Sequence, residues 1–426
     1  MTSPIPSPAT PDCCAEFARA TGVSRRGFLQ GVGAAGLSYA VGSAVVTVAG
    51  ASSAAADGVG GNGVLVVLSM RGAADGLSLV VPHGDPIYYK ARPTIAIPSE
   101  KLLAKDAFFG LHPALAPLVP MWSAGTMAAV HATGMQVPNR SHFAAMEVVE
   151  DADPGSSERV GWLNRLIGEL PGESPLQGLA LGAEAPTSMF GPQPTMGFAS
   201  LDKAVIAGAD SQTDPNDPRM KSMAAMWRRT RSPLKESVQS SMAAVGQLTA
   251  VRKSADTSAS YPNSDLGKAL SSIARTLRGN VGVSVVTVDQ GDWDMHSSLG
   301  TLQWGRMIDN ADDFAKSVAA FFNDLGPLAD QVTLVTLSEF GRRVVENSNA
   351  GLDHGWGNVM FLFGAGVKGG YFGNWPGLSN TLDADLTVTT DYRSVLAEVV
   401  ERRTGASAAK VFPGGPSARV GAMRTT

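Results

Sequence analysis

The amino-acid sequence predicts an α/β fold: a doubly wound, mostly parallel sheet with helices on both faces. Short apolar runs rich in β-branched residues alternate with longer segments of helical periodicity, as expected when crossover helices join parallel strands. Polar clusters directly follow two of these runs, which is where an α/β fold presents functional residues. The chain of 426 residues is also long enough to bury a large core without disulfides.

The elements are expected in the following order along the chain. The apolar, β-branched runs predict strands at 64–70, 126–131, 281–288, 331–337 and 359–363. Helical periodicity predicts helices at 113–123, 141–150, 159–169, 265–278, 304–325 and 392–403. Residues 170–215 are rich in Pro, Gly and Ser, and a polar helical stretch at 218–251 follows them. We therefore expect an insertion at about 170–260 within one domain spanning 57–426.

The N-terminus has the pattern of a twin-arginine export signal. Arg25 and Arg26 precede an uncharged stretch at 31–50, and the small residues Ala54 and Ala56 fit a signal-peptidase site. The expected signal is residues 1–56, with the twin-arginine translocase as a transient partner and a periplasmic, extracellular or cell-surface location. A retained membrane anchor is the alternative, but seven of the twenty residues at 31–50 are Gly or Ser, which makes the stretch weakly hydrophobic.

Composition narrows the classes of function. Both cysteines, Cys13 and Cys14, leave with the expected signal, so thiolate catalysis is excluded in the mature chain. The formal net charge of −4, without an evident basic stripe, does not favour nucleic-acid binding. No later segment is long and apolar enough for a stable membrane span.

Three polar clusters in the last third of the chain, at 292–296, 338–342 and 353–357, predict a metal site. The first two follow expected strands, and the third precedes one. Aspartate and histidine together suit zinc or manganese, with magnesium or calcium as alternatives.

Within these clusters, Asp292 and His296 are four residues apart, so a helical turn would place both side chains on one face. The alternative is a solvated pair, or an aspartate that caps a helix. His354 would supply a third ligand and leave a coordination position open for water or substrate.

The pattern Asp292-Trp293-x-x-His296, with a later histidine at His354, resembles the metal motif of the alkaline phosphatase superfamily. The resemblance implies an alkaline phosphatase-like fold and one or two metal ions. It also implies that a second site would draw on an aspartate after the first strand, a serine or threonine nucleophile and an Asp-His pair after a later strand. The candidates here are Asp75, Ser141 and Glu339.

The mature chain as a whole resembles an uncharacterised family of bacterial exported proteins that lies near the alkaline phosphatases and sulfatases. The motifs that carry this resemblance, beside the three clusters, are Arg71 to Leu77, Pro82 to Pro86, Arg92-Pro93, Leu111 to Pro113, Asn139 to Phe143 and Gly161 to Arg165. The family has no settled activity, so the resemblance says little about substrate.

One motif departs from the superfamily. Where its enzymes have an Asp-His pair after a strand, this chain has Glu339 and Phe340, so an imidazole ligand is missing. The second site could be weak or absent, or completed by His142, His131 or Asp353.

Residues beside the expected ligands are candidates for catalysis. Ser141 lies at the expected start of a helix, where backbone amides favour an anionic phosphate, although serine is also a common helix cap. Arg140, Arg342 and Arg71 could each clamp a phosphate or sulfate oxygen, or form structural ion pairs.

The sequence thus predicts an exported metal-dependent hydrolase of phosphate or sulfate esters, with a small-molecule ester as substrate and Ser141 as nucleophile. The alternative is a non-catalytic exported protein that binds a metal or ligand on the same fold.

Overall fold

The computed structural model describes residues 37–41, 44–48, 63–182, 185–205, 217–231 and 235–425. Most of the expected signal at 1–56, including the arginine pair and the cleavage site after Ala56, lies outside the described residues. The part that is described forms two strands, β1 (Leu37–Val41) and β2 (Ala44–Val48), which pair antiparallel with each other.

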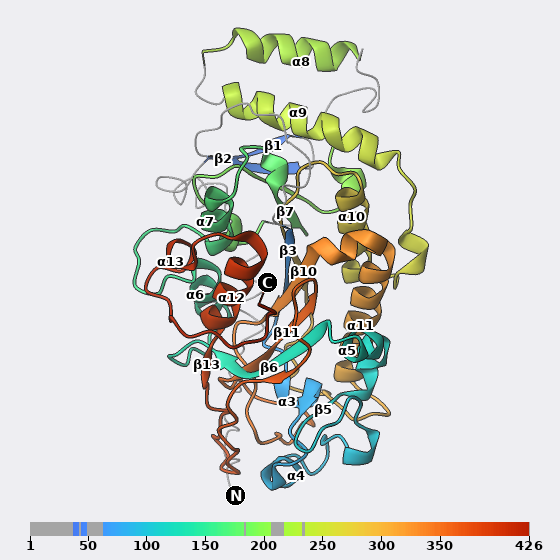
Figure 1. The fold of residues 1–426 in the computed structure, drawn as a ribbon, viewed down its shortest axis with the longest axis vertical. Helices are drawn as coiled ribbons and strands as arrows, with labels where there is room; N and C mark the ends of the chain where they lie inside the picture. Colours follow the sequence, from blue (N-terminus) through green and yellow to red (C-terminus); the bar gives the residue numbers. More distant parts are fainter. Residues whose placement is uncertain are drawn as a thin grey trace, which may run out of the picture.

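The described strands form one large sheet in the order β1-β2-β8-β7-β9-β3-β10-β11-β6-β12, with β13 paired to β6 (Figure 1). The remaining strands of this sheet are β3 (Val64–Met70), β6 (Met127–Gly134), β7 (Gly178–Leu181), β8 (Thr195–Phe198), β9 (Val285–Gln290), β10 (Val332–Leu337), β11 (Asn358–Gly364), β12 (Gly370–Phe372) and β13 (Thr390–Asp391). A separate pair consists of β4 (Val80–Val81) and β5 (Gly110–Leu111).

The centre of the sheet is parallel, which confirms the predicted fold class. Strands β8, β7, β9, β3 and β10 all run in the same direction. Strand β11 runs opposite to both β10 and β6. The start of β11 therefore lies at the same edge of the sheet as the carboxyl ends of its neighbours.

Helices cover both faces of this sheet, as the doubly wound class requires. The longer helices are α6 (His142–Asp151), α7 (Trp162–Glu169), α8 (Pro218–Arg229), α9 (Lys235–Arg252), α10 (Asp265–Arg278), α11 (Arg306–Leu325) and α12 (Tyr392–Thr404). The shorter ones are α3 (Gly76–Leu79), α4 (Pro86–Ala91), α5 (Val119–Ser123), α13 (Ala408–Val411) and single turns at η1 (Ser99–Lys101), η2 (Pro113–Leu118), η3 (Pro175–Gln177), η4 (Thr187–Met189), η5 (Leu201–Lys203), η6 (Ser258–Ser260) and η7 (Gly326–Gln331).

Alternation along the central strand β3 divides the core into two layers. Val66 and Leu68 belong to the core shared with α9, α10 and α11. Leu65 and Val67 point to the opposite face, where they share a core with α6, α7, α12 and α13. All four side chains are buried, as expected for a strand covered on both faces. Figure 1 shows the two helical layers on either side of the sheet.

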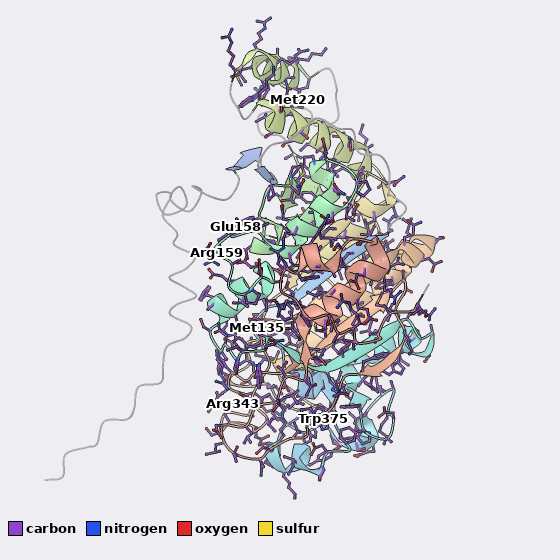
Figure 2. The ribbon with its side chains drawn as sticks, turned by 60° about the vertical axis from the view of Figure 1, so that its left-hand side comes forward. Met135, Glu158, Arg159, Met220, Arg343 and Trp375 are labelled. Atoms are coloured by element: carbon purple, nitrogen blue, oxygen red, sulfur yellow. The ribbon has the colours of Figure 1, made fainter. Side chains whose placement is uncertain are left out.

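The segment expected as an insertion is partly built into the sheet. Strands β7 and β8 come from this segment, and β7 pairs in parallel with β9. Helices α8 and α9 follow and form one end of the molecule, with α8 outermost (Figures 1 and 2). Among the described residues, no helix combines the length and apolar character needed to cross a membrane.

Candidate metal centre

Four loops meet at one edge of the sheet. Residues 71–75 follow β3, residues 291–296 follow β9 and residues 338–342 follow β10. Residues 353–357 lead into β11, whose reversed direction brings its start to the same edge. Parallel strand ends thus assemble residues that lie far apart in the sequence.

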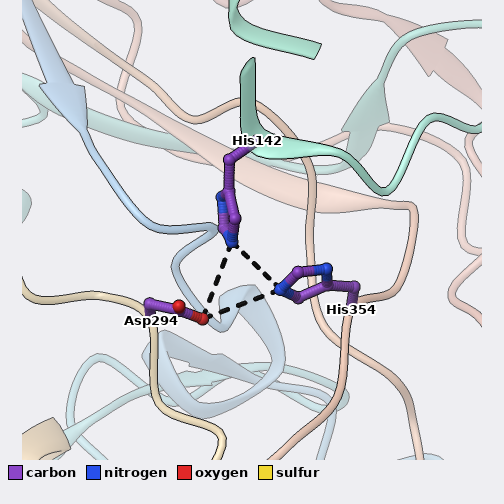
Figure 3. A group of neighbouring side chains, drawn as sticks. All are labelled: His142, Asp294 and His354. Carbon is purple, nitrogen blue, oxygen red and sulfur yellow. Dashed lines mark hydrogen bonds and ion pairs between the residues drawn. The ribbon is translucent and has the colours of Figure 1, made fainter. Parts of the chain in front are cut away.

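Three side chains from these loops and from α6 could together hold a metal ion: His142, Asp294 and His354 (Figure 3). Each offers one ligand atom, and these atoms lie within 4.8 Å of one another. The Nε2 atoms of His142 and His354 are 3.0 Å apart. Oδ1 of Asp294 is 3.7 Å from each of these nitrogens.

A third imidazole, that of His296, adjoins this triad. Its Nε2 lies 2.8 Å from Nε2 of His354 and 3.1 Å from Oδ1 of Asp294. The side chain of His296 is 38% exposed, so the cluster is accessible to solvent from this side.

The other ring nitrogen of each histidine is turned to an acceptor. Nδ1 of His142 lies 2.7 Å from the Glu339 carboxylate. Nδ1 of His354 lies 2.8 Å from the carbonyl oxygen of Arg140, and Nδ1 of His296 lies 3.3 Å from Oδ1 of Asp353. Acceptors at Nδ1 favour the tautomer with the proton there, which leaves the Nε2 lone pairs directed at the cluster.

Glu339 is a buried carboxylate that fixes His142. Besides the histidine, it accepts hydrogen bonds from the Gly72 amide at 2.9 Å and from the Ser338 hydroxyl at 3.2 Å. Burial alone would raise the pKa of Glu339, but the bonds from His142 and Gly72 outweigh it and lower the pKa. Gly72 has φ +107°, and a Cβ there would lie 2.5 Å from the Asp294 amide nitrogen, so this close approach requires glycine.

The pKa of His142 is shifted in the opposite direction to that of Glu339. Burial would lower its pKa, but Asp294 and Glu339 together raise the pKa of His142 to about 9. Phe340, the residue that replaces an imidazole in the superfamily pattern, is buried and packs against His142 and His354 with ring centroids 4.9 and 5.0 Å away. The phenylalanine therefore supports the two imidazoles by packing.

Arg342 holds Asp294 in place. Its guanidinium is 1% exposed and donates to Asp294 Oδ1 at 2.6 Å. It also donates to the backbone oxygens of Ala73 and Leu352, among others, and so ties three loops together. Partial burial would raise the pKa of Asp294, but the three histidines and Arg342 hold it well below its ordinary range. Arg342 is thus engaged by the protein rather than free to clamp a substrate.

The structure places Asp292 away from the cluster. The expected helical turn does not form, because residues 292–295 have no regular secondary structure and Asp292, with φ +66°, is in the left-handed region. Its side chain is 89% exposed and faces Arg306 at 4.0 Å. Burial nevertheless alternates along this segment, because Trp293 and Met295 are buried while Asp294 and His296 are partly exposed and contact each other at 3.1 Å. This alternation is the sequence signal that identifies Asp294.

Asp75 also lies apart from the cluster. It is 2% exposed and binds the fully buried Arg92 through both carboxylate oxygens, at 2.5 and 2.9 Å. It also accepts from the Ser78 amide, as the N-cap of α3. Its lone pairs are therefore used within the protein.

Ser141 and Arg140 border the cluster. Ser141 is exposed at the N-cap position of α6, and its side chain makes no capping hydrogen bond. The Arg140 side chain forms an ion pair with Asp385. The backbone carbonyl of Arg140, rather than its guanidinium, contacts a metal-site histidine, His354.

Two other sequence candidates lie outside the cluster. Arg71 pairs with Glu150 at 2.5 Å and with Asp289 at 3.2 Å. His131 is buried and stacks on Phe109, and burial lowers its pKa to about 4.

The chain belongs to a family described as proteins of unknown function (DUF1501), whose model matches residues 112–399, about two thirds of the sequence. No curated protein matches the sequence. Among solved structures, the chain is similar to the C-terminal periplasmic domain of EcEptC from Escherichia coli in complex with zinc, with 11% identity and a TM-score of 0.31 over 72% of this chain and 74% of that chain. A similarity this distant carries no argument about function.

Proposed function

We propose that this member of the DUF1501 family is a metal-dependent hydrolase of phosphate or sulfate esters, with one divalent cation bound by His142, Asp294 and His354. The observation that carries the proposal is the convergence of two Nε2 atoms and one carboxylate oxygen, with every histidine Nδ1 held by an acceptor. Without a cation, one of these two nitrogens, which are 3.0 Å apart, must carry a proton, and the raised pKa of His142 allows its Nε2 to do so; a bound cation would replace that proton.

The donor set fits a first-row divalent ion. Ligands at about 2.0–2.1 Å in tetrahedral geometry lie roughly 3.4 Å from one another. The observed separations of 3.0 to 3.7 Å among His142, Asp294 and His354 bracket this value. Imidazole with carboxylate suits zinc or manganese better than magnesium or calcium, which prefer oxygen ligands alone.

Three protein ligands leave a fourth position for substrate or water, as in catalytic zinc sites. A cation there would polarise an ester oxygen and lower the pKa of a nearby hydroxyl. Ser141 precedes the ligand His142 by one residue, is exposed, and keeps its hydroxyl out of the helix cap. We therefore propose Ser141 as the nucleophile. The first amides of α6, a ten-residue helix, would favour the negative charge of the ester group.

A single ion is favoured over two. The second site implied by the superfamily would use Asp75, which is saturated by Arg92. Glu339 is committed to His142 and to backbone and hydroxyl donors.

One observation favours a second function, non-catalytic metal binding. His296 Nε2 lies within 3.1 Å of both Asp294 Oδ1 and His354 Nε2, so it could occupy the fourth coordination position. A cation with four protein ligands would have no open position for substrate, so it would serve binding or stability rather than turnover.

Elemental analysis tests the metal site. We expect one equivalent of zinc or manganese in the wild-type protein and none in a His142→Ala/His354→Ala variant, while Asp292→Asn, the matched control, keeps its metal. Absence of metal from wild-type protein dialysed against both ions would refute the site.

Turnover separates the two functions. With 4-nitrophenyl phosphate and 4-nitrophenyl sulfate as probes, we expect activity that disappears in Ser141→Ala while the metal content persists. A metal-loaded protein that hydrolyses neither ester, and gains no activity in His296→Ala, supports the binding function.

We further propose that the chain is exported through the twin-arginine route, on the basis of Arg25 and Arg26. An Arg25→Lys/Arg26→Lys variant should remain in the cytoplasm of the producing cell, whereas the wild type should appear outside the cytoplasmic membrane. Equal export of both would contradict this route.

A further inference from the structure

Helix α8 carries a basic surface that the proposed hydrolase does not use. The helix, Pro218–Arg229, contains four cationic residues and no acidic one, and Arg231 follows it directly. None of its residues is buried. Within the described part of the chain, no carboxylate pairs with Arg228, Arg229 or Arg231.

The two sides of α8 differ in chemistry. Met220 and Met223 lie on one side and pack against the apolar core next to α9. By helical periodicity, Arg228 and Arg229 lie on the other side, and both are exposed. Met226, 61% exposed, lies on the flank next to Arg229, opposite the flank that carries Arg228. The outward side is therefore cationic with one apolar side chain in reach.

The position of α8 isolates this charge. Figures 1 and 2 place the helix at one end of the molecule, beyond α9. Residues 217–231 carry five cations and one carboxylate, so the rest of a chain with formal net charge −4 carries −8. Among the described residues, α8 lies at the end of the molecule, so a flat anionic surface that approaches this end meets α8 before the elements behind it.

From this geometry we infer that the outward side of α8, where Arg229 is flanked by Arg228 and Met226, docks on an anionic lipid membrane together with Arg231, which follows the end of the helix. Clusters of several Lys or Arg on a helix bind anionic bilayers through charge, each cation contributing separately. Met226 can enter the head-group region of a bilayer. Its apolar side chain would add no binding free energy with a purely ionic partner. A helix side at the end of the molecule suits a planar surface.

Nucleic acid is the competing polyanion, and the structure favours it less. Charge alone would allow either polyanion to contact these arginines, so the apolar contact decides between them. Met226 of α8 is exposed, whereas the Trp227 ring is half-buried and so less available for base stacking.

Vesicle sedimentation of the full chain tests the inference. The probes are unilamellar vesicles of phosphatidylcholine alone and of an equimolar mixture with phosphatidylglycerol. The variant is Arg228→Gln/Arg229→Gln/Arg231→Gln. The control is Lys101→Gln/Lys253→Gln/Lys268→Gln, which removes the same charge from exposed positions elsewhere. Because the substituted arginines are exposed, both variants should unfold at the wild-type temperature.

We expect wild type and control to bind the anionic vesicles and not phosphatidylcholine, and to be released by high salt. The arginine variant should partition about 10- to 100-fold more weakly. Met226→Ser should bind more weakly than wild type at equal salt. Equal binding to both vesicles, equal loss in variant and control, or tighter binding to duplex DNA than to anionic vesicles at the same salt would each overturn the inference.

Discussion

Asp75 and Asp294 are two carboxylates at the same edge of the sheet, and they differ in what surrounds them. Asp75 is 2% exposed and its oxygens are used by Arg92 and by the first turn of α3. Asp294 is 34% exposed, takes one hydrogen bond from Arg342, and presents the same oxygen to three imidazoles. A carboxylate can bind a metal when its neighbours leave some of its lone pairs without a hydrogen-bond donor. A position after a strand is therefore not enough to identify a metal ligand.

The largest expected effect concerns Asp75, whose role should be stability alone. Asp75→Asn leaves the buried guanidinium of Arg92 without a counter-charge, which costs about 3–5 kcal/mol of unfolding free energy. Urea unfolding measures the loss, with Asp292→Asn as the exposed control. Folded Asp75→Asn protein should retain its metal, and a stable variant that has lost its metal would reverse the comparison.

The second prediction concerns Asp294, whose role should be metal binding. Asp294→Asn removes the charged ligand, so metal affinity should fall beyond the roughly 10- to 100-fold that loss of a supporting partner costs. Titration with a zinc-competing chelator measures the change. Unchanged affinity in Asp294→Asn, or an equal loss in Asp292→Asn, would contradict the assignment.

The contrast between buried and partly exposed side chains applies to the histidines as well. Burial lowers the pKa of His112 and of His131 to about 4, so both are neutral in the folded protein. The unfolded chain takes up these protons below about pH 6.5. Stability is therefore fully present above this pH and falls as the pH drops to about 4, by at most about 3 kcal/mol per histidine.

Denaturant unfolding at several pH values between about 4 and 6.5 measures how steeply the unfolding free energy depends on pH. His112→Asn keeps an acceptor for the Ala114 amide, which the imidazole now caps, and should make the slope shallower. If the unfolding free energy has the same dependence on pH in variant and wild type, His112 does not contribute to that dependence.

The smallest expected effect concerns Glu339, which orients His142. Glu339→Gln keeps an acceptor but loses the charge that supports the imidazole, so metal affinity should fall about tenfold. The same chelator titration applies, and Ser338→Ala is the milder control because the Ser338 hydroxyl lies closer to the Met70 carbonyl oxygen, at 2.8 Å, than to Glu339, at 3.2 Å. An affinity unaffected by Glu339→Gln would show that the His142 ring needs no carboxylate.

Much of the fold could be predicted from sequence because its central elements are long and periodic. The strand expected at 64–70 and the helix expected at 265–278 have the bounds of β3 and α10. Strands β7 and β8 were missed since each has only four residues and includes a glycine, so neither forms a clear apolar run.

The candidate site was only partly predictable. His296, His354 and Glu339 were identified by position after or before strands, and the structure brings them together. Asp294 was missed because a helical spacing was assumed for a segment that has no regular secondary structure. The basic side of α8 was missed for another reason, since a net charge averaged over the chain hides five cations within fifteen residues.

The sequence separation of the metal-site residues has one more consequence. His142 and His354 are 212 residues apart and meet only when the sheet has closed from β6 to β11. An ion that binds this cluster binds the completed chain and not its parts, and it adds its binding free energy to the folded state alone. A bound ion in the cluster would then distinguish fully folded molecules from incompletely folded ones.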